Sequence, residues 1–378
     1  MNFLTVPKGC LLAMALLVHG SCGGDGGSSP PPPLTGWAAI RANTHPSVAL
    51  PAEFGTPRVQ ELAVDGWEDG ICISRGGLHL YAVYVPADLL SFTLAGADQH
   101  EAESYLRGPT FGMDLTTIPP VGAPLPTMWL HGDILHASRS SLGQPFSAWQ
   151  RTTMSQPVWS EGAPQPSGAG GADWDLFAYT TNDHPTDYNA HTVILHHAAH
   201  DPIATGSPLP APVTTATNED NPHVERLSAN DLVLFFDSGD RQVGRIHDLW
   251  YTTSADDGIT WTAPASVTSI NTVNDEHQPH LWKDSGGVWW LYYTATNPGD
   301  GKLGIFRAKQ QTPGDWDSWT AKELVIGAGN ALAVGEPTLT ANGDLSFVVI
   351  TEDTVNGTAT NRYDGDPWFV PRIPAGGG

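Results

Sequence analysis

A spacing of about 58 residues between similar segments most constrains the fold of this chain. The segment NDEHQPHLW at 274–282 aligns with TNEDNPHVE at 217–225, and related acidic starts precede other apolar runs. Five glutamates taken as equivalent are separated by 93, 58, 57 and 60 residues, and these are Glu68, Glu161, Glu219, Glu276 and Glu336. A period of this length indicates a repeated supersecondary unit.

Each acidic start is followed by further short apolar segments that have the composition of strands. A second segment lies at 78–85, 175–181, 231–238, 288–295 and 344–351, and a third at 133–139, 192–198, 248–253, 303–309 and, more weakly, 361–363. These segments are rich in aromatic and β-branched residues, and turn signals such as DSGG and ANGD precede several of them. Three or four strands repeated in this way predict an all-β fold, a five-bladed β-propeller.

The last repeat is too short to supply all its own strands. We expect the range 37–64 to provide the missing outer strand and to close the ring, which would remove exposed sheet edges. A β-sandwich shows no such period and the coils of a β-solenoid are shorter, so the propeller is favoured over both. The predicted domain spans 37–373, followed by a Gly-rich tail at 374–378.

The N-terminus has the layout of an exported protein. Residues 1–21 place Lys8 before a short apolar run, which is typical of a signal peptide and too short to span a bilayer. A Gly/Ser/Pro tether follows at 22–36. The small residues before Cys22 resemble the lipobox of bacterial lipoproteins, which implies a lipid such as palmitate on Cys22 and a cell-envelope, outer-membrane location. Ordinary secretion is the alternative.

Charge and cysteine content exclude several classes of partner. The net charge is −23, from 17 Lys and Arg against 40 Asp and Glu, which disfavours nucleic acid as a partner. If Cys10 is cleaved off and Cys22 is lipidated, Cys72 stands alone and no disulfide framework is possible. We expect a monomer that meets the membrane only through its lipid anchor.

The acidic starts should converge on one end of a central channel, because the innermost strand of each blade lines it. Converging carboxylates shift their pKa values, bind a cation or pair with histidine. One protonated and one ionised carboxyl is the arrangement that glycoside hydrolysis requires. The alternative is that each acid caps its strand, and Pro222 and Pro279 suit strand beginnings in the same way.

The pattern over roughly 60–370 resembles the five-bladed propeller glycosidases of the arabinanase, xylosidase and fructosidase kind. The resemblance implies that Asp69 is the general base and that Glu219 or Asp220 is the proton donor. It also implies that Glu161 tunes the donor, and we expect Glu276 to assist. A glycoside hydrolase, possibly inverting, is the enzyme class that follows.

Aromatic side chains flank the acidic starts. Trp67, Trp159 and Trp282 are predicted to stack on sugar rings, with Glu68 and Glu336 also contacting substrate. The alternative is that these tryptophans pack between blades.

Histidines add a possible metal site. His223 and His280, with His277 and Asp275, are predicted to hold one divalent cation, calcium or zinc, in the channel. A second candidate is HHAAH, which supplies His196, His197 and His200.

A single S-x-D-x-G-x-T-W motif runs from Ser254 to Trp261. It resembles the Asp box of sialidase-type propellers, where it caps the hairpin between the third and fourth strands of a blade. A sialidase itself is disfavoured, because an arginine cluster and an N-terminal R-I-P motif are missing. The sequence therefore predicts carbohydrate binding and hydrolysis, with a non-catalytic glycan- or metal-binding lipoprotein, or a periplasmic scaffold, as alternatives.

Overall fold

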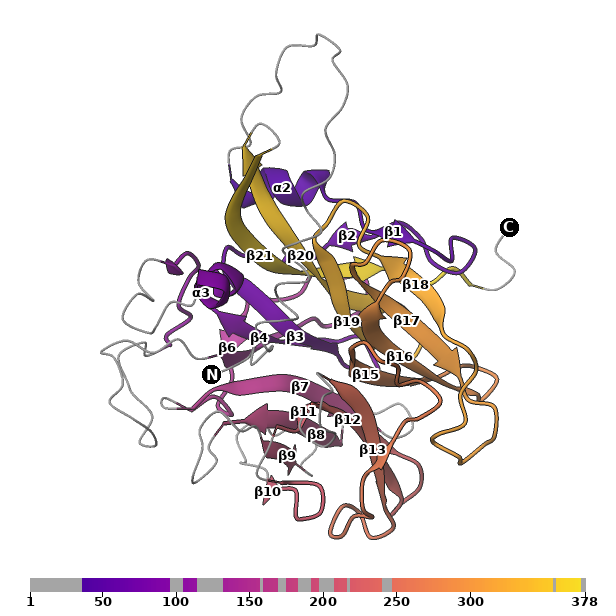
Figure 1. The fold of residues 1–378 in the computed structure, drawn as a ribbon. Helices are drawn as coiled ribbons and strands as arrows, with labels where there is room; N and C mark the ends of the chain where they lie inside the picture. The colour runs from indigo at the N-terminus through magenta and orange to yellow at the C-terminus, as the bar shows by residue number, and fades with distance from the viewer. Residues whose placement is uncertain are drawn as a thin grey trace.

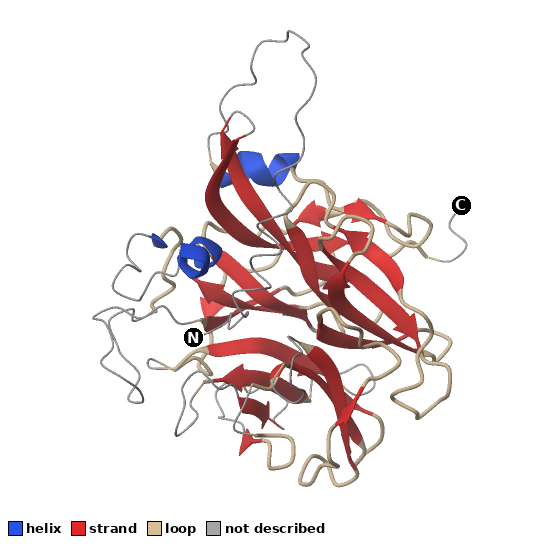
Figure 2. Ribbon diagram, viewed as in Figure 1, coloured by secondary structure: helices blue, strands red, loops and turns tan. Residues whose placement is uncertain are grey.

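The computed structural model describes residues 36–95, 105–113, 132–156, 159–168, 175–182, 192–196, 207–215, 218–239, 247–355 and 358–374. The predicted signal peptide, Cys22, His197 and His200 lie outside these residues. The described part is built mainly of strands, which confirms the predicted all-β class (Figure 2). Within it, no helix is both long enough and apolar enough to cross a bilayer.

The described strands form four sheets, of five, four, four and eight strands. The eight-stranded sheet contains two antiparallel groups joined by one parallel pairing, and the resulting five antiparallel groups are called units 1 to 5 (Figure 1). Unit 1 contains β3 (Trp67–Ile73), β4 (His79–Val85), β5 (Asp133–Ser138) and β6 (Gln150–Arg151). Unit 2 contains β7 (Glu161–Ser167), β8 (Leu176–Thr181), β9 (Thr192–His196) and β10 (Ser207–Pro208). Unit 3 contains β11 (Asp220–Arg226), β12 (Leu232–Ser238), β13 (Asp248–Ser254) and β14 (Ala265–Ser266).

The last two units each take a strand from the N-terminal region. Unit 4 contains β15 (Glu276–Lys283), β16 (Trp289–Thr296), β17 (Leu303–Lys309) and β18 (Glu323–Gly327), and β1 (Ser47–Val48) pairs with β18. Unit 5 contains β19 (Ala333–Leu339), β20 (Leu345–Val355) and β21 (Thr358–Val370), and β2 (Arg58–Val59) pairs with β21. The pairing of β2 is the one expected of an outer strand supplied by 37–64, whereas the addition of β1 to unit 4 was not predicted.

The first strands of the five units surround a common axis. Contacts run in a closed cycle from β3 to β7, β11, β15, β19 and back to β3. Apolar side chains fill the space between neighbouring units, as where Phe235 of unit 3 packs with Leu291 and Trp316 of unit 4. The hydrophobic core therefore lies between units, and polar residues of the first strands lie near the axis.

Every first strand has a β-bulge at the same place. The pairing register shifts there in all five units, and the residue at the bulge has a positive φ between 45° and 58° in each case: Gly70, Ala163, Asn221, Gln278 and Glu336. A bulge adds a residue to one strand and turns the local side chains. The same local turn therefore recurs five times around the axis.

The motif from Ser254 to Trp261 forms the turn between β13 and β14. Asp256 accepts hydrogen bonds from the backbone N–H and the hydroxyl of Thr260, at 2.8 and 2.6 Å. Trp261 is buried against residues of units 2 and 3. The turn thus fixes a ring that packs between the two units.

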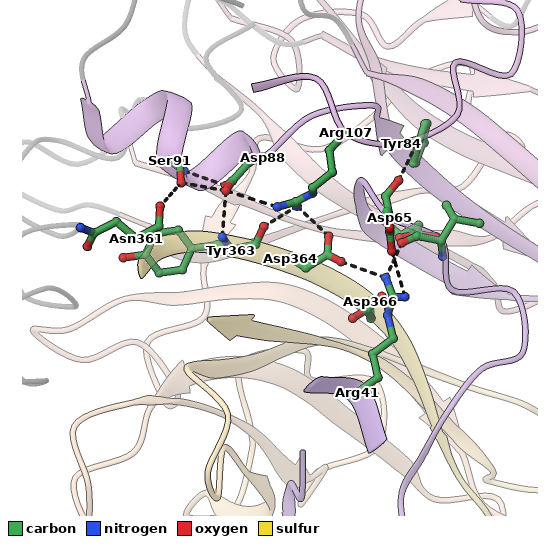
Figure 3. Close-up of polar contacts among 12 residues, drawn as sticks. Arg41, Asp65, Tyr84, Asp88, Ser91, Arg107, Asn361, Tyr363, Asp364 and Asp366 are labelled. Carbon is green, nitrogen blue, oxygen red and sulfur yellow. Dashed lines mark hydrogen bonds and ion pairs between the residues drawn. The ribbon is translucent and has the colours of Figure 1, made fainter. Parts of the chain in front are cut away.

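Units 5 and 1 meet at a seam where β21 runs parallel to β3, with Gly365 opposite Trp67. Two short helices, α2 (Trp37–Asn43) and α3 (Leu89–Ala95), lie beside it. Figure 3 shows Arg41 of α2 and Arg107 reaching the buried carboxylates Asp364 and Asp366. Arg41 donates to Asp366 at 2.7 Å and to Asp364 at 2.9 Å, and Arg107 donates to Asp364 at 2.9 Å.

Candidate functional site

A small, open pocket of about 40 Å³ lies on the axis. Three consecutive residues from each first strand line it, beginning at the bulge: 70–72, 163–165, 221–223, 278–280 and 336–338. The middle residue is proline in four of the five strands. Because no other described residue lines the pocket, its walls follow directly from the fivefold repeat of the bulge.

A group of polar side chains gathers where the first strands begin, and we call it the mouth cluster. Its members are Asp69, Asp220, Asp237, His247, Gln278 and Glu336. Asp69 accepts hydrogen bonds from Trp67 Nε1 and from the backbone N–H of Gly70, both at 3.1 Å. Asp220 accepts from the backbone N–H of Asn221 at 2.9 Å.

Glu336 is the member whose proton is held most firmly. Burial, together with the hydrogen-bonded Asp69 carboxylate, raises the pKa of Glu336 well above its usual range. Gln278 Nε2 donates to Glu336 Oε1 at 2.8 Å, and the Glu336 backbone N–H donates to Gln278 Oε1 at 3.1 Å. The Glu336 carboxyl therefore holds its proton to a higher pH than an ordinary glutamate does.

Asp237 and His247 form an ion pair beside them. Burial alone would lower the pKa of His247, but its hydrogen bond to Asp237, with Asp275 and Asp220 nearby, raises the pKa to about 9. Burial would raise the pKa of Asp237, but His247, His277 and the Gln278 backbone N–H lower it. The mouth cluster thus holds a carboxyl with a raised pKa, Glu336, beside an imidazole that is charged at pH 7, His247.

The floor of the pocket is formed by the third residue of each lining triplet: Cys72, Gln165, His223, His280 and Thr338. Three of these accept a backbone N–H from the next strand: Thr338 from Ile73 at 3.1 Å, Gln165 from Val224 at 2.9 Å, and His280 from Leu339 at 3.1 Å. In unit 2 the residue equivalent to Ile73 is Pro166, which has no backbone N–H to donate. The residue that would accept that bond, in the preceding unit 1, is Cys72, whose sulfur is a weak acceptor.

These floor contacts bear on the predicted metal site. His280 Nε2 accepts the Leu339 N–H, and His223 Nε2 lies 3.1 Å from Glu225 Oε1, which is also bonded by Arg75. His277 instead belongs near His247, Asp237 and Asp69 at the mouth. Among the described residues, no three His, Cys, Asp or Glu side chains are grouped as metal ligands. The predicted set of His223, His280, His277 and Asp275 is therefore split between two places.

Four of the predicted acids share one structural contact. Each accepts a backbone N–H four or five residues earlier: Glu68 from Val64, Glu161 from Gln156, Glu219 from Thr215 and Glu276 from Thr272. All four are completely buried and none lines the pocket. This is the capping role that the alternative interpretation expects, although burial does raise the pKa of Glu276.

Glu336 is not the fifth member of that set. The register places Val334 at the capping position of unit 5 and Glu336 at the bulge, two residues later. The predicted equivalence of Glu336 with the other glutamates is therefore wrong, and the bulge explains why Glu336 reaches the pocket.

The tryptophans predicted to stack on sugar are placed differently. Trp67 and Trp282 are 3% and 5% exposed and pack in hydrophobic clusters. Trp282 Nε1 also donates to the Thr340 carbonyl at 3.0 Å. Their rings are closed to a ligand, so the stacking prediction is wrong for both, whereas Trp159 is half-buried and does not line the pocket.

The sequence analysis missed Asp237, His247 and Gln278. Asp237 and His247 lie outside the first strands, at the end of β12 and just before β13, so the repeat of acidic starts did not mark them. An acid that ends the apolar run DLVLFFD was the available signal for Asp237. Gln278 was not predicted because it carries no charge and stands between His277 and His280, which were taken as the candidate site residues.

No protein-family model and no curated protein matches the chain. Among solved structures it is similar to the catalytic domain of a GH62 α-L-arabinofuranosidase from Coprinopsis cinerea, at 10% identity over 82% of this chain and 92% of that chain, with a TM-score of 0.49. It is also similar to an α-L-arabinofuranosidase from Podospora anserina solved with cellotriose, at 9% identity over 84% and 92%, with a TM-score of 0.45. An endo-arabinase from Bacteroides thetaiotaomicron matches at 11% identity over 83% and 95%, with a TM-score of 0.45. At such identities and TM-scores, these likenesses assign no activity to the chain.

Proposed function

We propose that the five units are the blades of a five-bladed β-propeller that binds a carbohydrate over the mouth of the axial pocket and hydrolyses a glycosidic bond at the mouth cluster. The closed cycle of contacts among the first strands and the fivefold bulge support the propeller assignment. The observation that carries the activity is the buried Glu336 carboxyl, which lines the pocket, is hydrogen-bonded to Asp69 and has a raised pKa.

Glu336 is the proposed general acid. Its raised pKa favours the protonated form, which can protonate the oxygen of the leaving sugar as the glycosidic bond breaks. Asp69, which resemblance makes a base, lies in hydrogen-bonding contact with Glu336 and is better placed to hold and tune that proton. The base must then be a separate carboxylate.

Asp220 is the proposed base. In the cycle of first strands, β7 separates β11 from β3, and β15 separates it from β19, so β11, which begins at Asp220, lies across the ring from the strands that carry the pair. Carboxyl groups on opposite sides of a sugar leave room for a water molecule, which Asp220 would deprotonate as it attacks the anomeric carbon. This arrangement favours inversion of the anomeric centre.

The charge of the mouth limits the substrate class. Asp69, Asp220 and Asp275 lie around the opening, and the positive His247 is already paired with Asp237. An anionic sugar would meet repulsion, so we expect a neutral saccharide. We also propose that Cys22 carries a lipid and that the protein lies in the cell envelope, on the N-terminal sequence alone.

The test is a hydrolysis screen with neutral nitrophenyl glycosides and neutral polysaccharides. The wild type should release sugar, with the anomer read by proton NMR, and Glu336→Gln and Asp220→Asn should each lower turnover about 100- to 10,000-fold. Circular dichroism of each variant should match the wild type. Hydrolysis that survives in Glu336→Gln would refute the proposed acid.

A non-catalytic glycan-binding protein is the second candidate. It is favoured by the capping contacts of Glu68, Glu161, Glu219 and Glu276, which show that acids at strand starts serve the fold. Calorimetric binding of a neutral saccharide without hydrolysis would select this candidate.

A further inference from the structure

Asp237 is a buried carboxylate that joins three segments at the mouth. It ends β12 and is completely buried. Its Oδ2 accepts from Asn221 Nδ2 and from the Gln278 backbone N–H, both at 2.8 Å, and its Oδ1 lies 3.2 Å from His247 Nδ1. No role is given to Asp237 by the repeat or by resemblance.

One side of Asp237 leads to the proposed acid. Gln278 is held at its backbone N–H by Asp237 and has the left-handed φ of 57° that non-glycine residues rarely adopt. The Gln278 side chain then makes both of its hydrogen bonds to Glu336. A conformation of this kind persists where surrounding contacts determine it, and Asp237 supplies one such contact.

The other side of Asp237 leads to His247. This imidazole is partly exposed, at 29%, and the charged groups near it are Asp237, Asp275, Asp220 and His277. Asp237 is the one that is hydrogen-bonded to its ring. The charge on His247 should therefore depend mainly on Asp237.

We infer that Asp237 is the positioning residue of the mouth: it fixes Gln278, and through it Glu336, while holding His247 as a cation. The inference rests on the proposed function where it gives Glu336 a catalytic role, but the hydrogen-bond geometry is independent of it. Two substitutions separate the two sides. An asparagine at 237 can keep one oxygen toward Gln278 and Asn221 and turn its amide toward His247, whereas an alanine removes every contact.

The experiment is an NMR titration of the histidine rings and of carbon-13-labelled glutamate carboxyls. Resonances of His247 and Glu336 are assigned by their loss in His247→Gln and Glu336→Gln. Asp237→Asn should lower the His247 midpoint from about 9 toward 6.5. Asp237→Ala should do the same and, relative to Asp237→Asn, should raise the Glu336 midpoint by about one unit, because the donor Gln278 is released.

Asp284→Ala is the matched control. Asp284 accepts two backbone N–H groups and one ring N–H, from Gly286, Val288 and Trp290, at the far end of β15. It should move neither midpoint. A His247 midpoint that stays near 9 in Asp237→Asn, or equal Glu336 midpoints in the two Asp237 variants, would overturn the inference.

Turnover separates this inference from the proposed function. If the wild type is active, Asp237→Ala should lower kcat at least about tenfold below Asp237→Asn with little change in KM, because Glu336 is misplaced rather than removed. If the wild type hydrolyses nothing, the proposed function fails, and the two titrations still decide whether Asp237 holds His247 and Gln278.

Discussion

Two regions of the molecule bury several carboxylates, and they differ in what surrounds those groups. At the seam, Glu68, Asp364 and Asp366 are completely buried, and Arg41 and Arg107 donate to the two aspartates (Figure 3). At the mouth, the Gln278 amide donates to Glu336, Glu336 is hydrogen-bonded to Asp69, and a pocket lies against Glu336.

A raised pKa occurs in both regions and therefore does not identify the site. Burial, with the neighbouring Asp366 and Asp364, raises the pKa of Glu68 well above its usual range, and burial raises the pKa of Asp366 to about 6 despite Arg41. Ion networks that serve the fold perturb pKa values as active sites do. What distinguishes the mouth is that Glu336 lines a pocket, whereas Glu68, Asp364 and Asp366 do not.

The largest expected effect comes from removing an arginine at the seam. Arg41→Ala leaves Asp364 and Asp366 without their shared partner, so the free energy of unfolding at pH 7 should fall by about 3–5 kcal/mol. The loss should shrink at lower pH, because the aspartates can then take protons. Urea unfolding at both pH values measures it.

Arg58→Ala is the control for that substitution. Arg58 is an exposed arginine on β2 whose guanidinium lies 5.3 Å from the centre of the Phe369 ring, and its removal should cost less than about 1 kcal/mol. Equal losses in Arg41→Ala and Arg58→Ala would mean that the seam does not depend on its ion pairs.

An effect of opposite sign, no larger than the upper end of the range given for Arg41→Ala, is expected at the mouth, with a distinct dependence on pH. The pKa of folded Glu336 is raised, so its contribution favours folding fully below the usual value of about 4.5 and is lost as pH rises through the folded pKa. Glu336→Gln cannot lose a proton, and the variant should be more stable than the wild type at pH 8. The free energy of unfolding should gain about 1.4 kcal/mol for each unit by which the folded pKa of Glu336 exceeds about 4.5. The gain stops growing once the folded pKa exceeds the pH of the measurement, about 8.

Chemical denaturation at pH 5 and pH 8 checks this difference. The gain of Glu336→Gln over the wild type should grow between the two values. A constant difference would place Glu336 among the ordinary surface carboxylates and would remove the contrast with the seam.

The smallest expected effect concerns a capping glutamate. Glu219 accepts from the Thr215 backbone N–H at 3.1 Å and from its hydroxyl at 2.6 Å, and Glu219→Gln preserves one acceptor. We expect a loss of about 1 kcal/mol in the free energy of unfolding. Turnover should fall at least about tenfold less than in Asp220→Asn, and a larger loss of turnover in Glu219→Gln would return Glu219 to the active site.

Periodicity in the sequence located the units because it reflects strand pattern, which is local. The spacing of Glu161, Glu219 and Glu276 identified three equivalent positions correctly, and the β-rich segments after them form strands. The resemblance to propeller glycosidases then implied catalytic roles for glutamates at these positions, although their side chains accept hydrogen bonds from the preceding loop. Direction depends on the bulge, which no spacing of acids reveals.

The rest of the site depends on contacts between distant segments. His247 and Asp237 come to the mouth because β12 pairs with β13 and ends beside the first strand of its unit. Trp67 and Trp282 flank acids in the sequence, yet each packs into the apolar space between units. Alternation along a strand allows a tryptophan to face either the pocket or the neighbouring unit, and the packing of the assembled units decides which face it takes.

The protonation of Glu336 tests the central claim most directly. Carbon-13 NMR of the glutamate carboxyls, with Glu336→Gln as the assignment control, reports whether this group is neutral at pH 7. The account predicts a Glu336 resonance at the position of a neutral carboxyl at pH 7 that moves only at higher pH. A Glu336 carboxyl that titrates near its ordinary value of about 4.5 would contradict the account.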